Sequence, residues 1–195
     1  MKIVFFDFDG TITTKDSLLD FVKYAVGKWN YRMGLFILSP ILAAYSIKLL
    51  SNSVAKEKLI SYFFKGLNSI YFQNIANTYS IEQIDKIIRP EALERIKWHQ
   101  EKGHKTVVVS ASMEYWLNGW CKKNKLELIA TKLESKNNRL TGKFSTKNCY
   151  GIEKVIRIKE NYNLKDYETI YAYGDSKGDK EMLSIADKKY YKYFE

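Results

Sequence analysis

The chain has 195 residues, a formal net charge of +10 and a hydrophobic content of 46%. This length suits one domain, or one domain with a modest insertion, and the hydrophobic content excludes a disordered chain. The two cysteines are too few for a disulfide framework, and MKIVFFDFDG lacks the features of a signal peptide, so we expect a cytoplasmic protein. The basic residues are scattered and match no nucleic-acid-binding motif, so we expect no nucleic-acid partner.

Five short segments have the apolar, β-branched composition of buried strands. They are Lys2–Phe6, Lys105–Val109, Leu126–Thr131, Thr169–Tyr173 and Lys188–Tyr193. Helical spacing marks Pro90–Lys102, Ser112–Asn124, Ile152–Tyr162 and Asp179–Ala186. Strands that alternate with helices predict an α/β fold with a parallel sheet covered on both faces.

Two stretches interrupt this alternation. Lys132–Cys149 contains turn residues between short β-like pieces, which predicts a hairpin. Residues 14–89 show helical spacing instead, at Ser17–Trp29, Leu35–Leu50, Val54–Phe64 and Ile70–Ile88. We therefore predict a core domain of residues 1–13 and 90–195 and an inserted helical domain of residues 14–89.

In an open parallel sheet, ligands bind beyond the carboxyl ends of the strands. The residues expected at these ends are Asp7, Asp9, Thr11, Ser110, Ala111, Ser112, Asp175 and Asp179. Carboxylates gathered at one edge repel each other unless a cation lies among them. Because no cluster of histidines or cysteines is available, the all-oxygen ligands indicate Mg²⁺.

These residue types also suit phosphoryl transfer. A carboxylate such as Asp7 can act as a covalent nucleophile, which divides one displacement into two steps. Asp9, two residues further on, can protonate the leaving alcohol and later activate water. A metal between Asp7 and Asp175 would offset their charge and polarise the phosphoryl group.

The segments DFDGTIT, SAS and GDSKGD, in this order, resemble motifs one, two and four of haloacid dehalogenase (HAD) superfamily phosphatases. The resemblance covers the whole chain. It implies a Rossmann-like core, and Thr14–Arg89 is similar to the inserted helical cap, of the C1 type, found in the phosphoserine-phosphatase-like subfamily IB. It also implies a Mg²⁺-dependent phosphomonoester hydrolase with an aspartyl-phosphate intermediate.

The resemblance implies a role for each acidic residue. Asp7 becomes the aspartyl-phosphate and a Mg²⁺ ligand, and Asp9 is the general acid and base. The main-chain carbonyl of Asp9 is a second metal ligand, and Asp175 is the remaining one. Asp179 supports the metal's water shell or the catalytic lysine.

The remaining implied groups bind phosphate. Thr11 and Ser110 hold phosphate oxygens, with backbone amides of both loops, including that of Ala111. The lysine of motif three begins a helix just before the last catalytic strand and counters the charge on phosphate and Asp7. Lys154 in Cys149-Tyr150-Gly151-Ile152-Glu153-Lys154 is our first choice and Lys147 the second.

Other enzyme classes fit less well. The segment Gly174–Gly178 matches the G-x-S-x-G pattern of serine hydrolases, but both histidines precede it in the chain, whereas that fold needs one after it. Thr141-Gly142-Lys143 lacks the preceding glycine of a P-loop. A dehalogenase has no leaving alcohol to protonate, which leaves Asp9 unexplained. A phosphotransferase remains an alternative within the superfamily, and a non-enzymatic binding protein would predict a missing catalytic residue.

The inserted segment would determine the substrate. Asp16 stands where phosphoserine phosphatases have a glutamate that reads the substrate ammonium, so a phosphoserine-like metabolite is only the alternative. Met33–Ile47 carries no charge, and basic and aromatic residues flank it. This segment resembles the cap of bacterial phosphatidylglycerophosphatases, which implies a lipid phosphate and peripheral contact with an anionic membrane. Its alternative covers are the other inserted helices or a second subunit.

Overall fold

A computed structural model describes the whole chain, residues 1–195. Its main sheet contains strands β1 (Lys2–Phe6), β2 (Lys105–Met113), β3 (Glu127–Thr131), β6 (Thr169–Gly174) and β7 (Lys188–Tyr191). All neighbouring pairs are parallel, in the order β3-β2-β1-β6-β7. The predicted α/β fold with a parallel sheet is therefore confirmed, and β1 is central because its side chains are buried on both faces.

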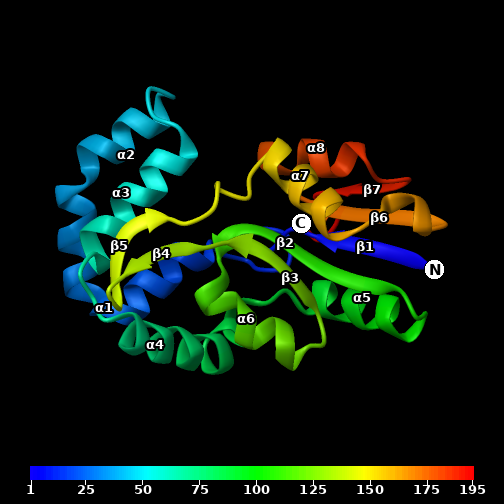
Figure 1. Cartoon of the computed structure of the whole chain (residues 1–195), viewed down its shortest axis with the longest axis horizontal. Helices are drawn as coiled ribbons and strands as arrows, with labels where there is room; N and C mark the ends of the chain where they lie inside the picture. Colours follow the sequence, from blue (N-terminus) through cyan, green and yellow to red (C-terminus); the bar gives the residue numbers. More distant parts are fainter.

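Alternate side chains of β1 pack on opposite layers of helices. Ile3 and Phe5 belong to a cluster with α7 (Ile152–Asn161) and α8 (Lys180–Ser184). Val4 and Phe6 belong to a second cluster, which includes buried residues of α5 (Pro90–Glu101) and α6 (Glu114–Lys123). Figure 1 shows α7 and α8 above the sheet and α5 and α6 below it.

The segment between β1 and α5 consists of helices, as predicted. These are α1 (Ser17–Ile37), α2 (Ser39–Ser46), α3 (Asn52–Phe64) and α4 (Ser69–Glu82), followed by a 3₁₀ turn at Ile84–Ile87. They lie together beyond one end of the sheet (Figure 1). None of the helices combines the length and the apolar composition that crossing a membrane requires.

The predicted boundaries of these helices were partly wrong. The sequence predicts that the first helix ends at Trp29. The structure has non-helical backbone at Gly27, where φ is +80°, but the helix resumes after it and α1 continues to Ile37. A second break falls at Leu38, shortly before Pro40, because a proline is accepted only in the first turn of a new helix. The predicted helix Leu35–Leu50 is therefore divided between α1 and α2.

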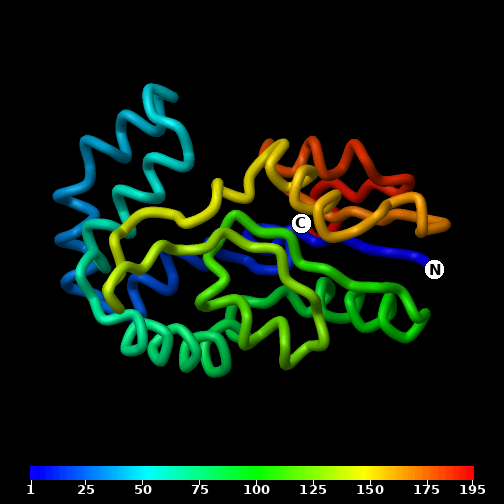
Figure 2. Tube along the Cα trace, viewed as in Figure 1, coloured from blue at the N-terminus to red at the C-terminus, as the bar shows by residue number.

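The chain leaves the sheet for the inserted helices after β1 and returns from them before α5, as the tube in Figure 2 shows. These two connections pair with each other. The amide of Thr14 donates to the carbonyl of Ile87 over 2.8 Å, and that of Arg89 donates to Ile12 over 2.9 Å. The segment that leaves the core and the segment that returns to it are therefore held together as a short antiparallel pair.

The predicted hairpin is confirmed as β4 (Leu133–Lys136) and β5 (Arg139–Phe144). We had placed it with the core, but Leu140 of β5 exchanges backbone hydrogen bonds with Gly66 and Leu67, after α3. Gly142 lies so close to Ser61 that an added Cβ would be 2.6 Å from the Ser61 Cα. The hairpin thus packs on the inserted helices, and the division into two domains stays a prediction.

Candidate active site

The predicted site residues meet at the carboxyl end of the parallel sheet. Asp7 follows β1, Ser110 lies near the end of β2, and Asp175 follows β6. Because β1 pairs with both β2 and β6, these three positions are neighbours across the sheet. Lys154 comes from the first turn of α7, which begins after Gly151.

The Lys154 ammonium is the centre of this edge. It is 1% exposed and donates to Asp7 Oδ1 at 2.5 Å, to Asp179 Oδ1 at 2.6 Å and to the Val109 carbonyl at 2.7 Å. These three acceptors match the three hydrogens of an ammonium group. Lys147, the second choice from the sequence, is exposed, so the structure places Lys154 and not Lys147 against Asp7.

Burial dominates the protonation of these groups. Desolvation, together with the charges of Asp179 and Asp9, raises the pKa of Asp7 to about 8, although Lys154 opposes the shift. Burial alone would lower the pKa of Lys154, but Asp7 and Asp179 hold it above its usual value. A bound cation would lower the pKa of Asp7, because it favours the carboxylate form.

Three carboxylates are close enough to share a cation. Side-chain oxygens of Asp7, Asp175 and Asp179 all lie within 4.8 Å of one another. Both oxygens of Asp179 are already engaged, Oδ1 by Lys154 and Oδ2 by the amide and hydroxyl of Ser176. The side chains best placed to bind a metal directly are therefore those of Asp7 and Asp175, and hard oxygen donors of this kind suit Mg²⁺.

Thr11 and Gly10 arrange the same carboxylates. The Thr11 hydroxyl donates to Asp175 Oδ1 at 2.8 Å and lies 3.4 Å from Asp7 Oδ2. Its predicted role as a phosphate ligand stays a prediction. Gly10 has φ +88°, and an added Cβ would lie 2.4 Å from Asp175 Oδ2, so the glycine after Asp9 is required by space as well as by backbone conformation.

The second motif lies inside a strand rather than after it. We predicted that the strand ends at Val109 and that a helix begins at Ser112, but β2 continues to Met113. Its pairing with β3 shifts register between Ser110 and Met113, a bulge of the kind that redirects side chains near active sites. The Ser110 hydroxyl accepts from the amide of Ser112 at 3.0 Å, and Ala111 lines the cavity described below.

The hydrogen-bond donors to Asp9 are uncharged, whereas Asp7 accepts from the Lys154 ammonium. Its Oδ1 accepts from the amide of Ser17 at 2.7 Å, and its Oδ2 accepts from the Ser112 hydroxyl. Burial and the nearby charge of Asp16 raise the pKa of Asp9. A carboxyl group with a raised pKa in a closed site is suited to general acid catalysis.

A cavity of about 230 Å³ opens onto these groups. Its lining includes Asp7, Asp9, Lys154 and Asp179, together with residues that sequence reasoning missed. These additional residues are Tyr45 of α2, Asn52 and Lys56 of α3, and Tyr150 and Ser176 of the core. No local pattern in the sequence marks them, because the folding of the inserted helices over the sheet brings them to the site.

Polar contacts hold the inserted helix α3 against the core at this cavity. Lys56 Nζ donates to the Ala111 carbonyl at 3.2 Å, and the Asn148 amide donates to Asn52 Oδ1 at 2.9 Å. Asn52 in turn donates to the Tyr45 hydroxyl at 3.0 Å. The inserted helices thus supply one wall of the cavity and the sheet edge supplies the other.

Gly178 makes room for Tyr150. An added Cβ at Gly178 would lie 2.3 Å from Cε2 of the Tyr150 ring. The aromatic ring takes the space that a side chain at this position would need, so Gly178 and the tyrosine before α7 form one packed unit.

Comparison with known proteins places the chain among characterised folds. The model of the haloacid dehalogenase-like hydrolase family matches residues 4–184. The chain is 35% identical over 195 residues to the protein CicA of Caulobacter vibrioides, a match that covers 98% of this chain and 86% of CicA.

Solved structures share the fold at lower identity. A protein of unknown function from Bordetella pertussis Tohama I superimposes with a TM-score of 0.82 at 19% identity, covering 95% of this chain and 86% of that one. A phospho-aspartyl intermediate analogue of phosphoserine phosphatase superimposes with a TM-score of 0.64 at 24% identity, covering 96% and 84%. Because the family model spans nearly the whole chain, the protein belongs to the haloacid dehalogenase-like hydrolases.

Proposed function

We propose that this hydrolase is a Mg²⁺-dependent phosphomonoesterase that works through an aspartyl-phosphate on Asp7. The observation that carries the proposal is the buried Lys154, which contacts both Asp7 and Asp179 at the edge where Asp175 also lies. One ammonium offsets the charge of only one of the three carboxylates. A further cation would offset the remaining negative charge and allow a phosphoryl dianion to bind. The likeness to a phosphoserine phosphatase in a phospho-aspartyl form supports the same reading.

In the first step, a carboxylate oxygen of Asp7 attacks phosphorus while the bond to the leaving oxygen breaks. Asp9 gives its proton to that oxygen, so that an alcohol departs. In the second step, Asp9 takes a proton from water, the water oxygen attacks phosphorus, and the bond to Asp7 breaks with release of inorganic phosphate. Lys154 stays charged throughout and opposes the negative charge on the phosphoryl oxygens.

A bound Mg²⁺ would supply Lewis-acid polarisation of the phosphoryl group and would offset the charge of Asp7. Asp7 and Asp175 would hold it with their side chains, and Asp9 with its main-chain carbonyl. Thr11 would keep Asp175 oriented, since it already donates a hydrogen bond to that carboxylate. Asp179 would act on the metal only through Lys154 and neighbouring water.

The finer part of the proposal is that the phosphate is carried by a lipid. Asp16, at the position that reads the substrate ammonium in phosphoserine phosphatases, lines the cavity here too, but its Oδ1 caps α1 by accepting from the amide of Leu19 at 3.0 Å. The cavity is small and polar, which suits a phosphorylated headgroup. The apolar part of such a substrate would lie outside it.

An apolar surface on α1 and on the turn that follows α2 supports this choice. We define the α1–α2 surface by its exposed members Trp29, Met33, Phe36, Ile37, Ile47 and Leu49. The first four follow helical spacing on one face of α1, and Phe36 and Leu49 are each 75% exposed. Helix α2 has no buried residue at all. Exposed Lys28, Arg32 and Lys48 flank this surface, and basic residues near an anionic bilayer contribute about 1 kcal/mol each.

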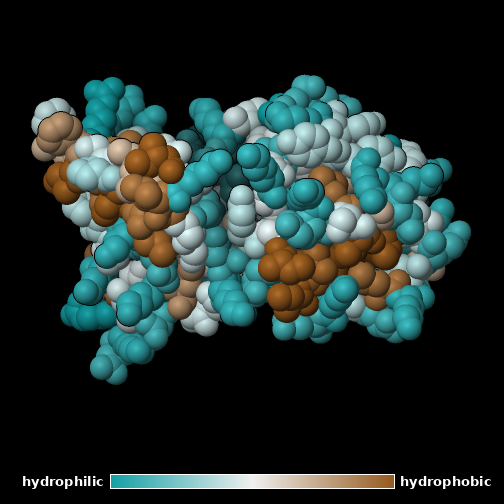
Figure 3. Space-filling view, turned by 90° about the horizontal axis from the view of Figure 1, so that it is seen from above, coloured by the Kyte–Doolittle hydropathy of each residue, from teal (hydrophilic) through white to brown (hydrophobic).

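Figure 3 shows hydrophobic side chains gathered over the inserted helices, separated by a hydrophilic, recessed region from a second group over the core. Complete burial of the apolar segment inside its own domain would have removed the reason for a membrane partner. Leu38, which is 5% exposed, and Gly34 are buried, and Leu35 and Ile41 are half-buried against the core cluster, whereas Met33, Phe36, Ile37 and Ile47 are exposed. We therefore propose an anionic phospholipid bilayer as the partner of the α1–α2 surface.

The nucleophile is tested by trapping the intermediate. Asp7→Asn removes the attacking carboxylate with little change in shape, and we expect less than about 1% of the wild-type rate. Acid quenching followed by mass spectrometry should find one added phosphoryl group in wild type and none in Asp7→Asn. Asp9→Asn should accumulate the phosphorylated form with an aryl phosphate, because hydrolysis of the intermediate is slowed. An Asp7→Asn protein that keeps substantial activity would refute the covalent mechanism.

The metal is tested by removal and by binding. Chelation should abolish hydrolysis and Mg²⁺ should restore it. Asp175→Asn should weaken Mg²⁺ binding by on the order of 10-fold or more, measured by calorimetry without substrate. Asp166→Asn is the matched control, since Asp166 is exposed and bonded only to Asn163. Full activity in a metal-free preparation would exclude this assignment.

The two lysines are separated by substitution. Lys154→Ala should lower kcat/KM by on the order of 10²-fold, because it removes a charge from a dry site. Lys147→Ala should leave kcat/KM nearly unchanged, because that side chain is exposed. Thermal unfolding of both variants controls for loss of structure. A larger loss in Lys147→Ala would move the assignment of motif three.

The lipid proposal is tested by flotation with liposomes. Wild type should float with vesicles that contain phosphatidylglycerol and not with pure phosphatidylcholine, and it should hydrolyse a lipid phosphate in detergent faster than phosphoserine. Replacing Trp29 and Phe36 with serine should lower the vesicle-binding constant by on the order of 10²-fold or more, measured as reduced flotation, since each large apolar side chain contributes about 1.5–3 kcal/mol when buried. Ile70→Ser with Tyr71→Ser is the matched control, because both residues are exposed on α4. Equal flotation of both double variants, or a preference for phosphoserine, would indicate a phosphatase of soluble metabolites.

A further inference from the structure

The Asp9 carboxyl is at the end of a chain of buried hydrogen bonds. Trp116 Nε1 lies 3.1 Å from Ser17 Oγ, and Ser17 Oγ lies 3.1 Å from Ser112 Oγ. The Ser112 hydroxyl in turn contacts Asp9 Oδ2. Ser17, Ser112 and Trp116 are all 0% exposed, so no water competes for these groups.

The hydrogen bonds of this chain share one direction. An indole N–H can only donate, and a serine hydroxyl has a single proton. Because Trp116 donates to Ser17, the Ser17 proton is free to point to Ser112, and the Ser112 proton then points to Asp9. Every hydrogen bond therefore runs toward the carboxyl group, and Asp9 Oδ2 is held as an acceptor.

Packing keeps each member of the chain in place. The Trp116 ring stacks on Phe21 of α1, with centroids 4.6 Å apart and an interplanar angle of 17°. Ser112 is fixed through its amide, which donates to the Ser110 hydroxyl. Ser17 is the first residue of α1, and its own amide donates to Asp9 Oδ1. Asp9 is thus held from β2, from α6 through Trp116, and from the inserted helix α1.

We propose that Trp116, Ser17 and Ser112 are positioning residues that orient Asp9 as the general acid. They fix the orientation of the Asp9 carboxyl group through Oδ2, while the Ser17 amide holds Oδ1. This inference rests on the proposed phosphomonoesterase function. It adds that the hydrogen bonds that orient the acid join residues of the core to Ser17 of the inserted segment. The acid is therefore aligned only when α1 is packed against the core.

Two substrates that differ in their leaving group distinguish a positioning role of these residues from a purely structural one. Phenyl phosphate needs its leaving oxygen protonated, whereas 4-nitrophenyl phosphate has nearly the same size and a much better leaving group. Loss of alignment of the acid should therefore affect the first substrate more. The parameter to compare is kcat/KM, because it reports the step in which Asp7 is phosphorylated.

Ser112→Ala removes the donor to Asp9. We expect kcat/KM to fall by on the order of 10-fold for phenyl phosphate and by less than about 3-fold for 4-nitrophenyl phosphate, a part of the 10²–10⁴-fold that a general acid contributes. Ser112→Thr, which keeps a hydroxyl, should restore the wild-type ratio of the two substrates. Asp9→Asn should show the same selective loss in stronger form and sets its upper limit.

Trp116→Phe removes the N–H that sets the direction of the chain and keeps an aromatic ring against Phe21. It should change the substrate ratio in the same direction as Ser112→Ala, by a few-fold. Trp120→Phe is the matched control on the same helix, because the indole N–H of Trp120 donates to the Asp85 carboxylate instead. Thermal unfolding should show that the two tryptophan variants remain folded.

The outcomes separate this inference from the proposed function. If wild type hydrolyses neither substrate with Mg²⁺, the proposed function fails. If wild type is active and Asp9→Asn is selective, but Ser112→Ala and Trp116→Phe lower both substrates equally, the chain has only a structural role and this inference is overturned. A Trp120→Phe protein with the same selectivity as Trp116→Phe would overturn it as well.

Discussion

The buried ammonium of Lys154 is the constraint on which the rest of this site depends. A charged group removed from water is strongly destabilising unless hydrogen-bonded partners of opposite charge surround it. Its partners come from the end of β1, from β2 and from the turn after β6, and the lysine itself comes from α7. One side chain thereby ties three neighbouring strand ends together. Separating any of them would leave a buried charge or a buried carbonyl without a partner.

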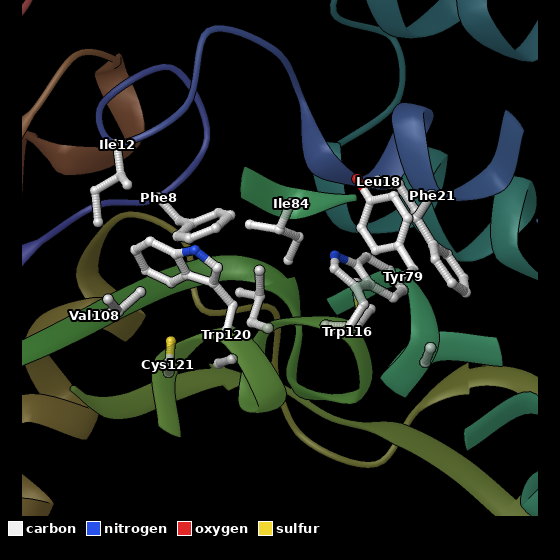
Figure 4. Packing of buried hydrophobic residues seen from close by; sticks show 14 of the residues in the cluster. Phe8, Ile12, Leu18, Phe21, Tyr79, Ile84, Val108, Trp116, Trp120 and Cys121 are labelled. Carbon is white, nitrogen blue, oxygen red and sulfur yellow. The ribbon is translucent and has the colours of Figure 1, made fainter. Parts of the chain in front are cut away.

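The inserted helices are held to the core unevenly. Figure 4 shows Phe8 and Trp120 beside the sheet and Trp116, Tyr79 and Phe21 toward the inserted helices, in one continuous buried cluster. The Trp120 amide also donates to the Ser80 hydroxyl of α4 at 2.8 Å. At the other side of the segment, α3 reaches the core at the cavity through the polar contacts of Asn52 and Lys56. Helix α3 is tied to α1 and α4 as well, because its buried Phe64 packs on Phe21 and Phe72. The inserted helices therefore share one aromatic core, and polar contacts are added to it at the cavity.

The sequence predicted the end of β1 and nearly that of β6, together with the acidic residues that follow them, because both depend on short-range patterns. The bounds of β1 and the location of Lys154 in the first turn of α7 follow from buried strand composition and from a glycine before a helix. The extension of β2 through Ser112 could not be predicted, since its pairing with β3 is a long-range interaction. The same holds for the hairpin on the inserted helices, whose hydrogen bonds join Leu140 to Gly66 and Leu67. Tyr45, Lys56 and Tyr150 reach the cavity only through tertiary packing.

Asp7 and Asp9 are two residues apart on one loop, yet their surroundings differ in kind. Asp7 faces an ammonium and two further carboxylates, so its charge depends on the cations around it, and a metal beside Asp175 would favour its ionised form. Asp9 receives only neutral donors, an amide and a hydroxyl, and lies near the negative charge of Asp16. Separating two adjacent carboxyl groups by their surroundings is what allows one to attack phosphorus as an anion while the other delivers a proton.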